Sequence, residues 1–281
     1  MRLLLSVFLT VSFFSLSAIG EETDSSSAWP FFAFENGMRD MAPEERIALL
    51  KELGYDGVGS ASPGNLVERL KLYDEAGLKV FSLYLGLEVF PDRFEIKPGV
   101  TEAMAQLKGR GETTVIELYV RGEGENTAVR DQAILGVKEV ARLADESGLR
   151  VVLYPHTGFH IDTVGKAFEL ATAVDRPNVG VMFNLCHFLR VEPESDLREV
   201  LTRAKPLLWR VSTSGADVGG DNWGALIQPL DSGTYSQSDF FALLSETGFD
   251  GAVGLQCFGI KEESRIHLGR SITAWKNLTS P

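Results

Sequence analysis

Two of the four histidines in this chain, His156 and His187, each follow an apolar segment that has the pattern of a buried strand. His187 comes three residues after Asn184, in the segment NVGVMFNLCHFLR. An imidazole changes its protonation state near neutral pH and also binds metal ions. The two histidines could therefore form an acid-base site or a metal site, or they could be packed, hydrogen-bonded residues at the start of loops.

Other polar side chains follow apolar segments in the same way. Glu117, in the segment VIELYVRG, could act as a general base or form a salt bridge with a nearby arginine. The amides of Asn184 and Gln256 could bind sugar hydroxyls, because an amide both donates and accepts hydrogen bonds, or they could satisfy loop backbone. Arg210 and Lys261 could orient hydroxyls and polarise a carbonyl group, or they could pair with neighbouring carboxylates.

The segments around these residues predict strands that alternate with helices. The predicted strands are 30–34, 57–59, 79–85, 114–118, 151–153, 179–183, 207–211 and 251–256. The predicted helices are 43–53, 66–76, 100–107, 128–146, 163–174, 197–204, 238–246 and 262–277. Strands and helices that alternate in this way predict parallel strand pairing through right-handed crossovers.

Two pairs of similar segments indicate a repeated unit. YDEAGLKV (73–80) and ADESGLRV (144–151) share a helix end, a glycine and a strand start, and ELGYDGVG (52–59) resembles ETGFDGAVG (246–254). Eight such units in about 250 residues predict a single (β/α)8 TIM barrel of the α/β class. No glycine-rich phosphate loop follows the first strand, which disfavours an open doubly wound sheet. In a barrel, the candidate residues would meet at the carboxyl ends of the strands.

Residues 1–20, MRLLLSVFLTVSFFSLSAIG, have the pattern of a secretory signal peptide. Arg2 precedes an apolar run, which is shorter than a typical membrane-spanning helix, and small residues follow it. We therefore expect cleavage after residue 20, a polar linker at 21–27, a barrel at 28–281, and a secreted or periplasmic protein without a membrane anchor.

The charge and the cysteines narrow the class of protein. The formal net charge is -12, and an acidic chain without a basic block repels phosphate backbones, so we expect no nucleic acid partner. Two cysteines, Cys186 and Cys257, are too few for a disulfide framework. Each follows a predicted buried strand, so we expect buried free thiols, with a disulfide as the alternative.

Four segments, VLYPHTG, GVMFNLCH, WRVSTSGAD and VGLQCFG, fall in the order and spacing of the xylose isomerase-like TIM barrels. Residues 28–277 resemble this family, which includes sugar isomerases, ketose epimerases, inosose dehydratases and endonuclease IV. The resemblance implies a divalent metal site made of a glutamate after strand five, an aspartate after strand six, a histidine after strand seven and a glutamate after strand eight.

This chain has neutral residues at those four positions: Tyr154, Asn184, Ser212 and Gln256. Asparagine and glutamine keep the shape of the acids but lose the charge that holds Mg²⁺ or Mn²⁺. We therefore expect no tightly bound metal and no other cofactor. The alternative is a divalent metal, Mn, Mg or Zn, the last of these on His156, His187 and Glu117.

Together these residues predict an isomerase or epimerase that acts on a sugar or polyol derivative by enolate-type proton transfer. One histidine would remove a proton next to a carbonyl group, and the other, or Glu117, would protonate the opposite side. The substrate-binding residues would be Tyr154, Asn184, Arg210, Gln256 and Lys261. The alternatives are a non-catalytic carbohydrate-binding barrel that has lost its metal site, and a lyase or hydrolase of 3-keto-glycosides.

Overall fold

The computed structural model describes residues 29–39, 41–122, 124 and 126–280. One sheet runs through them, with strands β1 (Phe31–Phe34), β2 (Gly57–Gly59), β3 (Lys79–Val80), β4 (Ser82–Val89), β5 (Phe94–Ile96), β6 (Val115–Gly122), β7 (Arg150–Leu153), β8 (Val179–Asn184), β9 (Leu208–Thr213) and β10 (Ala252–Leu255). The strands are short and mostly buried, as expected for apolar segments covered on both faces.

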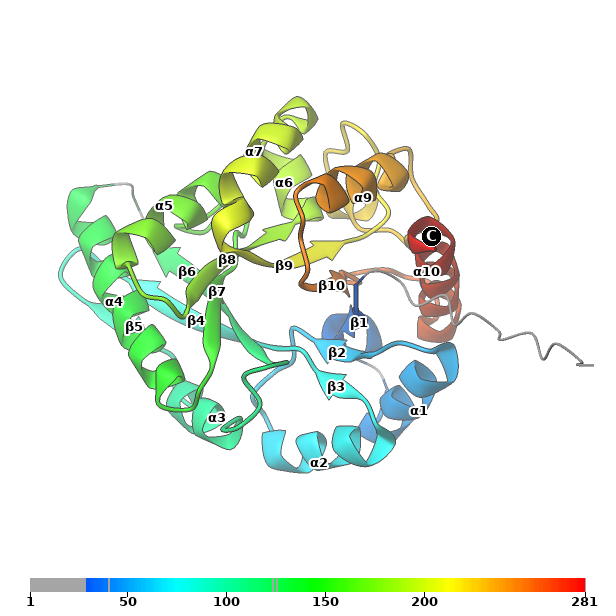
Figure 1. Cartoon of the computed structure of the whole chain (residues 1–281), viewed down its shortest axis with the longest axis horizontal. Helices are drawn as coiled ribbons and strands as arrows, with labels where there is room; N and C mark the ends of the chain where they lie inside the picture. The colour runs from blue at the N-terminus through cyan, green and yellow to red at the C-terminus, as the bar shows by residue number, and fades with distance from the viewer. Residues whose placement is uncertain (1–28, 40, 123, 125, 281) are drawn as a thin grey trace, which may run out of the picture.

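The sheet curls into a closed ring of parallel strands (Figure 1). Neighbouring strands follow the order β3-β2-β1-β10-β9-β8-β7-β6-β4-β5. β3 and β4 are two parts of one barrel strand, because β3 pairs with β2 and β4 pairs with β6. A parallel bridge between Ala61 and Leu83 joins the two edges. The predicted (β/α)8 barrel is confirmed, with β5 added antiparallel to β4.

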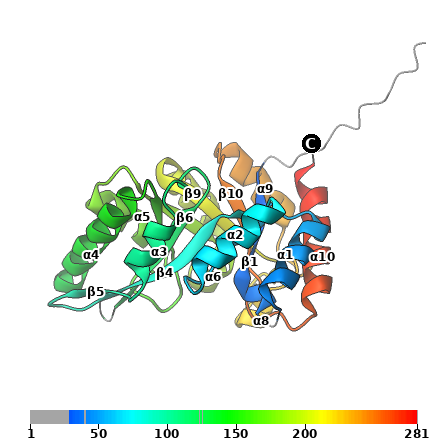
Figure 2. The same ribbon diagram turned by 90° about the horizontal axis from the view of Figure 1, so that it is seen from below.

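Helices surround the barrel, as the side view also shows (Figure 2). They are α1 (Pro43–Leu53), α2 (Leu66–Ala76), α3 (Val100–Gln106), α4 (Thr127–Asp145), α5 (Val164–Val174), α6 (Leu185–Val191), α7 (Leu197–Ala204), α8 (Trp223–Leu226), α9 (Gln237–Glu246) and α10 (Ser264–Thr279). The sequence pattern did not predict α6, α8 or β5. α6 starts directly after β8, so no loop residue marks the junction.

Alternating residues of the strands pack on opposite sides of the barrel wall. Phe31 of β1 stacks on Trp275 of α10 with ring centroids 4.0 Å apart, so it faces the helices. Its neighbour Phe32 therefore faces the barrel interior, where it packs in one cluster with Val115 and Tyr154. The strands thus place alternate residues inside the barrel and, near their carboxyl ends, around its mouth.

Three other expectations have different outcomes. Cys186 and Cys257 are buried and free, as expected. The predicted signal peptide at residues 1–20 and the linker at 21–27 lie outside the described residues and stay predictions. Within the described part of the chain, no helix combines the length and apolarity needed to cross a membrane.

Candidate active site

A cavity of about 320 Å³ opens at the carboxyl ends of the barrel strands. One lining residue lies on β4, and the others lie in the segments that follow β1, β2, β7, β8, β9 and β10. The lining residues are Asn36, Arg39, Ser60, Tyr84, Tyr154, His156, His187, Trp223, Ile227, Gln256 and Phe258. Convergence of so many strand ends on one cavity is the usual construction of an active site in this fold. The cavity includes both histidines that the sequence singled out.

The two imidazoles lie close together, with ring centroids 4.2 Å apart. His156 follows β7 and stacks on Phe159 at 3.9 Å, whereas His187 lies in the first turn of α6 and meets the ring of Trp223 edge-on at 5.2 Å. Aromatic neighbours on each side fix both rings. The sequence prediction that successive strand ends bring these histidines together is therefore confirmed.

Hydrogen bonds to Thr157 assign a different tautomer to each imidazole. The Nδ1 atom of His156 lies 2.9 Å from the Thr157 carbonyl oxygen, which can only accept, so this Nδ1 carries the hydrogen. The Nδ1 atom of His187 lies 3.3 Å from the Thr157 backbone N–H, which can only donate, so this Nδ1 accepts. In their neutral forms, His156 then has a free electron pair on Nε2, and His187 has a hydrogen there.

Both imidazoles are held in the neutral form at pH 7. Burial, with a smaller contribution from the neighbouring His156, lowers the pKa of His187 to about 3. Burial also lowers the pKa of His156 from its ordinary value. In the described part of the chain, neither Nε2 atom has a hydrogen-bond partner. The cavity therefore offers a proton acceptor beside a hydrogen-bond donor.

Tyr154 stands between the amides of Asn184 and Gln256. Asn184 Nδ2 donates to the Tyr154 hydroxyl, and Gln256 Nε2 lies 3.5 Å from the same oxygen. Asn36 Nδ2 in turn donates to Gln256 Oε1 over 2.8 Å. Burial holds the pKa of Tyr154 well above its usual value, so the hydroxyl keeps its hydrogen. Since both amides approach the oxygen as donors, that hydrogen remains for a ligand in the cavity.

The four positions implied by the family do not fit a hard divalent cation. Tyr154, Asn184 and Gln256 offer neutral groups that hydrogen-bond to one another, and Ser212 is a buried hydroxyl. Mg²⁺ and Mn²⁺ need charged oxygens. Among the described residues, no three histidine, cysteine or acidic side chains come together as possible ligands, so the structure does not join Glu117 to the two imidazoles.

Glu117 lies inside the barrel and does not line the cavity. The strand predicted from the sequence ends at residue 118, whereas β6 continues to Gly122. The carboxylate therefore lies deeper in the barrel than expected. Ser82 Oγ donates to Glu117 Oε1 over 2.7 Å, and Oε2 has no partner among the described residues. Burial raises the pKa of Glu117 to about 7. This position below the mouth gives no support to the predicted role of Glu117 as a base, which stays a prediction.

Two predicted substrate-binding residues also lie elsewhere. Arg210 donates to the backbone oxygen of Thr113 over 2.6 Å, at the amino-terminal end of β6, so it points away from the mouth. Lys261 lines a different cavity, in the loop after β10. Sequence reasoning instead missed Arg39 and Ser60. Both follow early strands, but neither has a residue type that marks a site without its tertiary neighbours.

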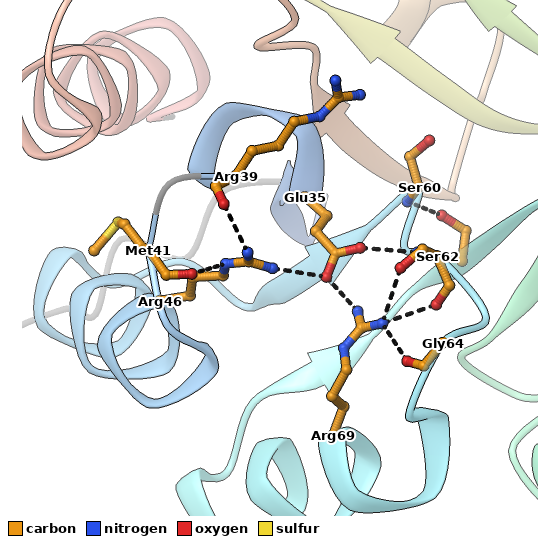
Figure 3. A network of polar contacts seen from close by, with 9 residues as sticks. Glu35, Arg39, Met41, Arg46, Ser60, Ser62, Gly64 and Arg69 are labelled. Carbon is orange, nitrogen blue, oxygen red and sulfur yellow. Dashed lines mark hydrogen bonds and ion pairs between the residues drawn. The ribbon is translucent and has the colours of Figure 1, made fainter.

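A second cavity of about 540 Å³ adjoins the first and shares Asn36, Arg39, Ser60 and Tyr84 with it. Figure 3 shows the network beside it, centred on the buried carboxylate of Glu35. That carboxylate accepts hydrogen bonds from Arg46 over 3.1 Å, from Arg69, and from the backbone of Ser62 over 2.8 Å. The network fixes the segments after β1 and β2 relative to each other.

Comparison with known proteins places this architecture in a family. Residues 47–274 match the xylose isomerase-like TIM barrel family, and the chain belongs to it. The inosose isomerase of Halalkalibacterium halodurans is 24% identical to this chain, over 76% of the chain and 84% of that protein.

Solved structures share the fold at low sequence identity. The 3-keto-D-glucoside 4-epimerase of E. coli superposes with a TM-score of 0.69 at 18% identity, covering 89% of this chain and 99% of that one. The D-allulose 3-epimerase of Methylomonas sp. superposes with a TM-score of 0.68 at 15% identity, covering 90% of this chain and 99% of that one. These two superpositions support the barrel assignment.

Proposed function

We propose that this protein is an isomerase or epimerase that acts on a small sugar or polyol derivative by proton transfer through an enolate, without a tightly bound metal. One observation carries the proposal: two neutral imidazoles of opposite tautomer lie side by side in the strand-end cavity. The similarity to an inosose isomerase and to two sugar epimerases supports the class of substrate and reaction.

The residues of the cavity divide the work of such a reaction. His156 Nε2 accepts the proton from a carbon next to a carbonyl, and the electron pair of the broken C–H bond moves to the carbonyl oxygen. His187 Nε2–H donates a hydrogen bond to that oxygen and stabilises its developing charge. In isomerisation, the hydrogen of the neighbouring hydroxyl moves to the enolate oxygen, and His156 returns its proton to the neighbouring carbon on the same face. In epimerisation, the enolate turns its other face to His156 before His156 returns the proton to the same carbon.

Neutral hydrogen-bonding groups orient the sugar in this scheme. Tyr154 donates its free hydrogen, and the amides of Asn36 and Gln256 present further polar atoms at the cavity wall. A neutral imidazole can donate a hydrogen bond to a carbonyl oxygen and keep its proton, because its pKa as an acid lies far above that of imidazolium.

The test is hydrogen exchange in D₂O. Purified protein is incubated with ketohexoses, inososes and 3-keto-glycosides, and NMR follows deuterium at the carbon next to the carbonyl. We expect exchange with at least one substrate, and we expect His156→Gln to slow it at least about 10²-fold. His160→Gln is the matched control, because His160 lies in the same loop but lines a different cavity. Full exchange by His156→Gln would disprove the mechanism.

A non-catalytic carbohydrate-binding barrel is the second candidate, favoured by the neutral residues at all four metal-ligand positions. Calorimetry with the same compounds separates it from the enzyme. Binding without deuterium incorporation or product after prolonged incubation would establish the binding protein. A released aglycone from a 3-keto-glycoside would instead identify elimination from the same enolate.

We also propose that the protein is exported, from the signal-peptide pattern of residues 1–20. Mass spectrometry of the protein expressed from its full sequence in a bacterial host tests this. We expect a mature chain that lacks these residues in the periplasm or medium. A full-length chain confined to the cytoplasm would contradict export.

A further inference from the structure

The strand-end cavity carries one formal charge among its described lining residues. Arg39 supplies it, while both histidines are neutral and the remaining lining residues are uncharged. The chain as a whole has a formal net charge of -12, so the charge of the cavity is opposite in sign to the net charge of the chain. A cation beside the reacting groups attracts a ligand of opposite charge.

Arg39 has no carboxylate partner among the described residues. The nearby carboxylate of Glu35 is occupied by Arg46 and Arg69, and Figure 3 shows the guanidinium of Arg39 pointing away from that network. Arg46 Nη2 donates to the Arg39 backbone oxygen over 3.2 Å, so the network holds the backbone and leaves the side-chain donors open.

The guanidinium of Arg39 lies over the ring of Phe258, with its central carbon 5.3 Å from the ring centroid. Phe258 follows β10 and is 45% exposed at the cavity mouth. Stacking on an aromatic ring orients a guanidinium plane and leaves its edge N–H groups free. These groups match the geometry of a carboxylate or phosphate, which they can bind with two parallel hydrogen bonds.

Arg39 also stands where three cavities meet. It lines the strand-end cavity, the cavity beside Glu35, and the cavity formed with the loop after β10. A substituent that extends from a sugar held at His156 and His187 into either neighbouring space would pass this side chain.

We propose that Arg39 binds an anionic group of the substrate, a carboxylate or a phosphate, so that the protein acts on sugar acids or sugar phosphates in preference to neutral sugars. This inference rests on the proposed function for the position of the reacting sugar. It assigns Arg39 to substrate specificity, while the proton transfer remains with the imidazoles.

Binding measurements on matched compounds test the proposal. Calorimetry compares a panel of hexoses and ketohexoses with their 6-uronic acids and 6-phosphates, using the wild-type protein and its variants. We expect an anionic member of at least one set to bind about tenfold more tightly than its neutral counterpart, which corresponds to about 1.4 kcal/mol. Preference for the uronic acid identifies a carboxylate substrate, and preference for the phosphate identifies a phosphate ester.

The variants connect this preference to Arg39. Arg39→Gln should remove the preference, and Arg39→Lys should keep part of it, because lysine retains the charge but not the planar fork. Arg203→Gln is the matched control, since Arg203 also lies over a phenylalanine, Phe168 at 5.6 Å, but on the outer helices. This control should keep the full preference.

Two results would overturn the inference: no set shows a preference for its anionic member, or Arg39→Gln retains that preference. Exchange in D₂O distinguishes this failure from failure of the proposed function. Exchange of neutral sugars without any anionic preference rejects the role of Arg39 and leaves the isomerase intact. Anionic preference that depends on Arg39, without exchange or product, supports the binding site and rejects the isomerase.

Discussion

The mouth of the barrel and its interior both hold buried polar side chains, but they differ in charge and in access. At the mouth, His156, His187 and Tyr154 are neutral and line a cavity. In the interior, Glu117 and Arg210 are ionisable and do not line the described cavity at the mouth. Glu117 accepts a hydrogen bond from Ser82 of the neighbouring β4, and Arg210 donates to the backbone oxygen of Thr113, which precedes β6. Position along a strand, more than residue type, therefore separates groups that can meet a ligand from groups that cannot.

The difference also concerns unused hydrogen-bonding capacity. The Nε2 atoms of the two imidazoles have no protein partner among the described residues, but they border space that a ligand can fill. Glu117 Oε2 also lacks a partner there, but it is enclosed. An enclosed carboxylate oxygen without a partner lowers stability. We therefore expect changes at the mouth to affect turnover and changes in the interior to affect folding.

The largest expected effect is on turnover. His187→Gln should lower kcat/KM by about 10²- to 10³-fold, the usual cost of losing a donor to a developing oxyanion. Glu117→Gln should leave kcat/KM nearly unchanged, because Glu117 does not line the cavity. Steady-state kinetics on the substrate found by deuterium exchange measures both. Equal losses in the two variants would show that the mouth and the interior act as one site.

The second effect is on stability, and it depends on pH. The carboxyl group of Glu117 has a pKa of about 7 in the folded protein, compared with 4.5 ordinarily. Below pH 4.5 it is protonated in both the folded and unfolded states, so its burial carries no ionisation cost. Between pH 4.5 and about 7 the carboxyl group ionises in the unfolded state but not in the folded state, so the free energy of unfolding falls as the pH rises, by about 3 kcal/mol at most, and this contribution is constant above about pH 7.

Glu117→Gln removes this pH dependence, because glutamine does not ionise. Urea unfolding should therefore show the variant gaining free energy of unfolding over the wild type at pH 8 and little or nothing at pH 4.5. Glu199→Gln, at an exposed position of α7, is the control, and it should change the free energy of unfolding by the same amount at pH 8 and at pH 4.5. A variant that is less stable at pH 8 than the wild type would contradict the assignment of Glu117 as a destabilising buried acid.

A smaller effect concerns the acid limit of activity. The base form of His156 is neutral, and its pKa lies below the ordinary value of about 6.5. We expect kcat/KM to stay constant between about pH 7 and 8 and to fall only below 6.5, as His156 takes up a proton. Arg121 contributes to this lowering, so Arg121→Gln should move the midpoint upward. An increase in kcat/KM on acidification would exclude neutral His156 as the base.

The sequence predicted the barrel and the histidine pair because both are local signals. Alternating apolar and amphipathic segments mark the βα units, and His156 and His187 each come a few residues after a strand, in segments that the order of strands makes neighbours. Glu117 could not be placed in this way. VIELYVRG has strand character throughout, so nothing in it shows that the strand continues to Gly122 and carries the carboxylate below the mouth.

The positions of charged side chains were predicted least well from the sequence, because their roles depend on partners that are distant in sequence. Arg210 lies on a correctly predicted strand, but its guanidinium reaches Thr113, 97 positions away, at the other end of the barrel. No pattern in the sequence singles out Arg39. Its significance comes from Arg46 and Arg69, which occupy the Glu35 carboxylate, and from Phe258, on which it stacks.

The smallest expected effect is that of removing divalent metal, for which we expect no change in kcat/KM. Neutral oxygens at the mouth bind hard cations weakly, so dialysis against EDTA should leave kcat/KM unchanged, and Mn²⁺ should not raise the thermal midpoint of the wild-type protein. Asn184→Asp combined with Gln256→Glu restores two charges beside the imidazoles, and this double variant should gain a midpoint that rises with Mn²⁺. Activity lost on chelation and recovered with Mn²⁺ in the wild type would show that neutral amides can hold a metal here. The contrast between wild type and double variant therefore tests whether the loss of two negative charges at the mouth turned a metal site into one that works with imidazoles alone.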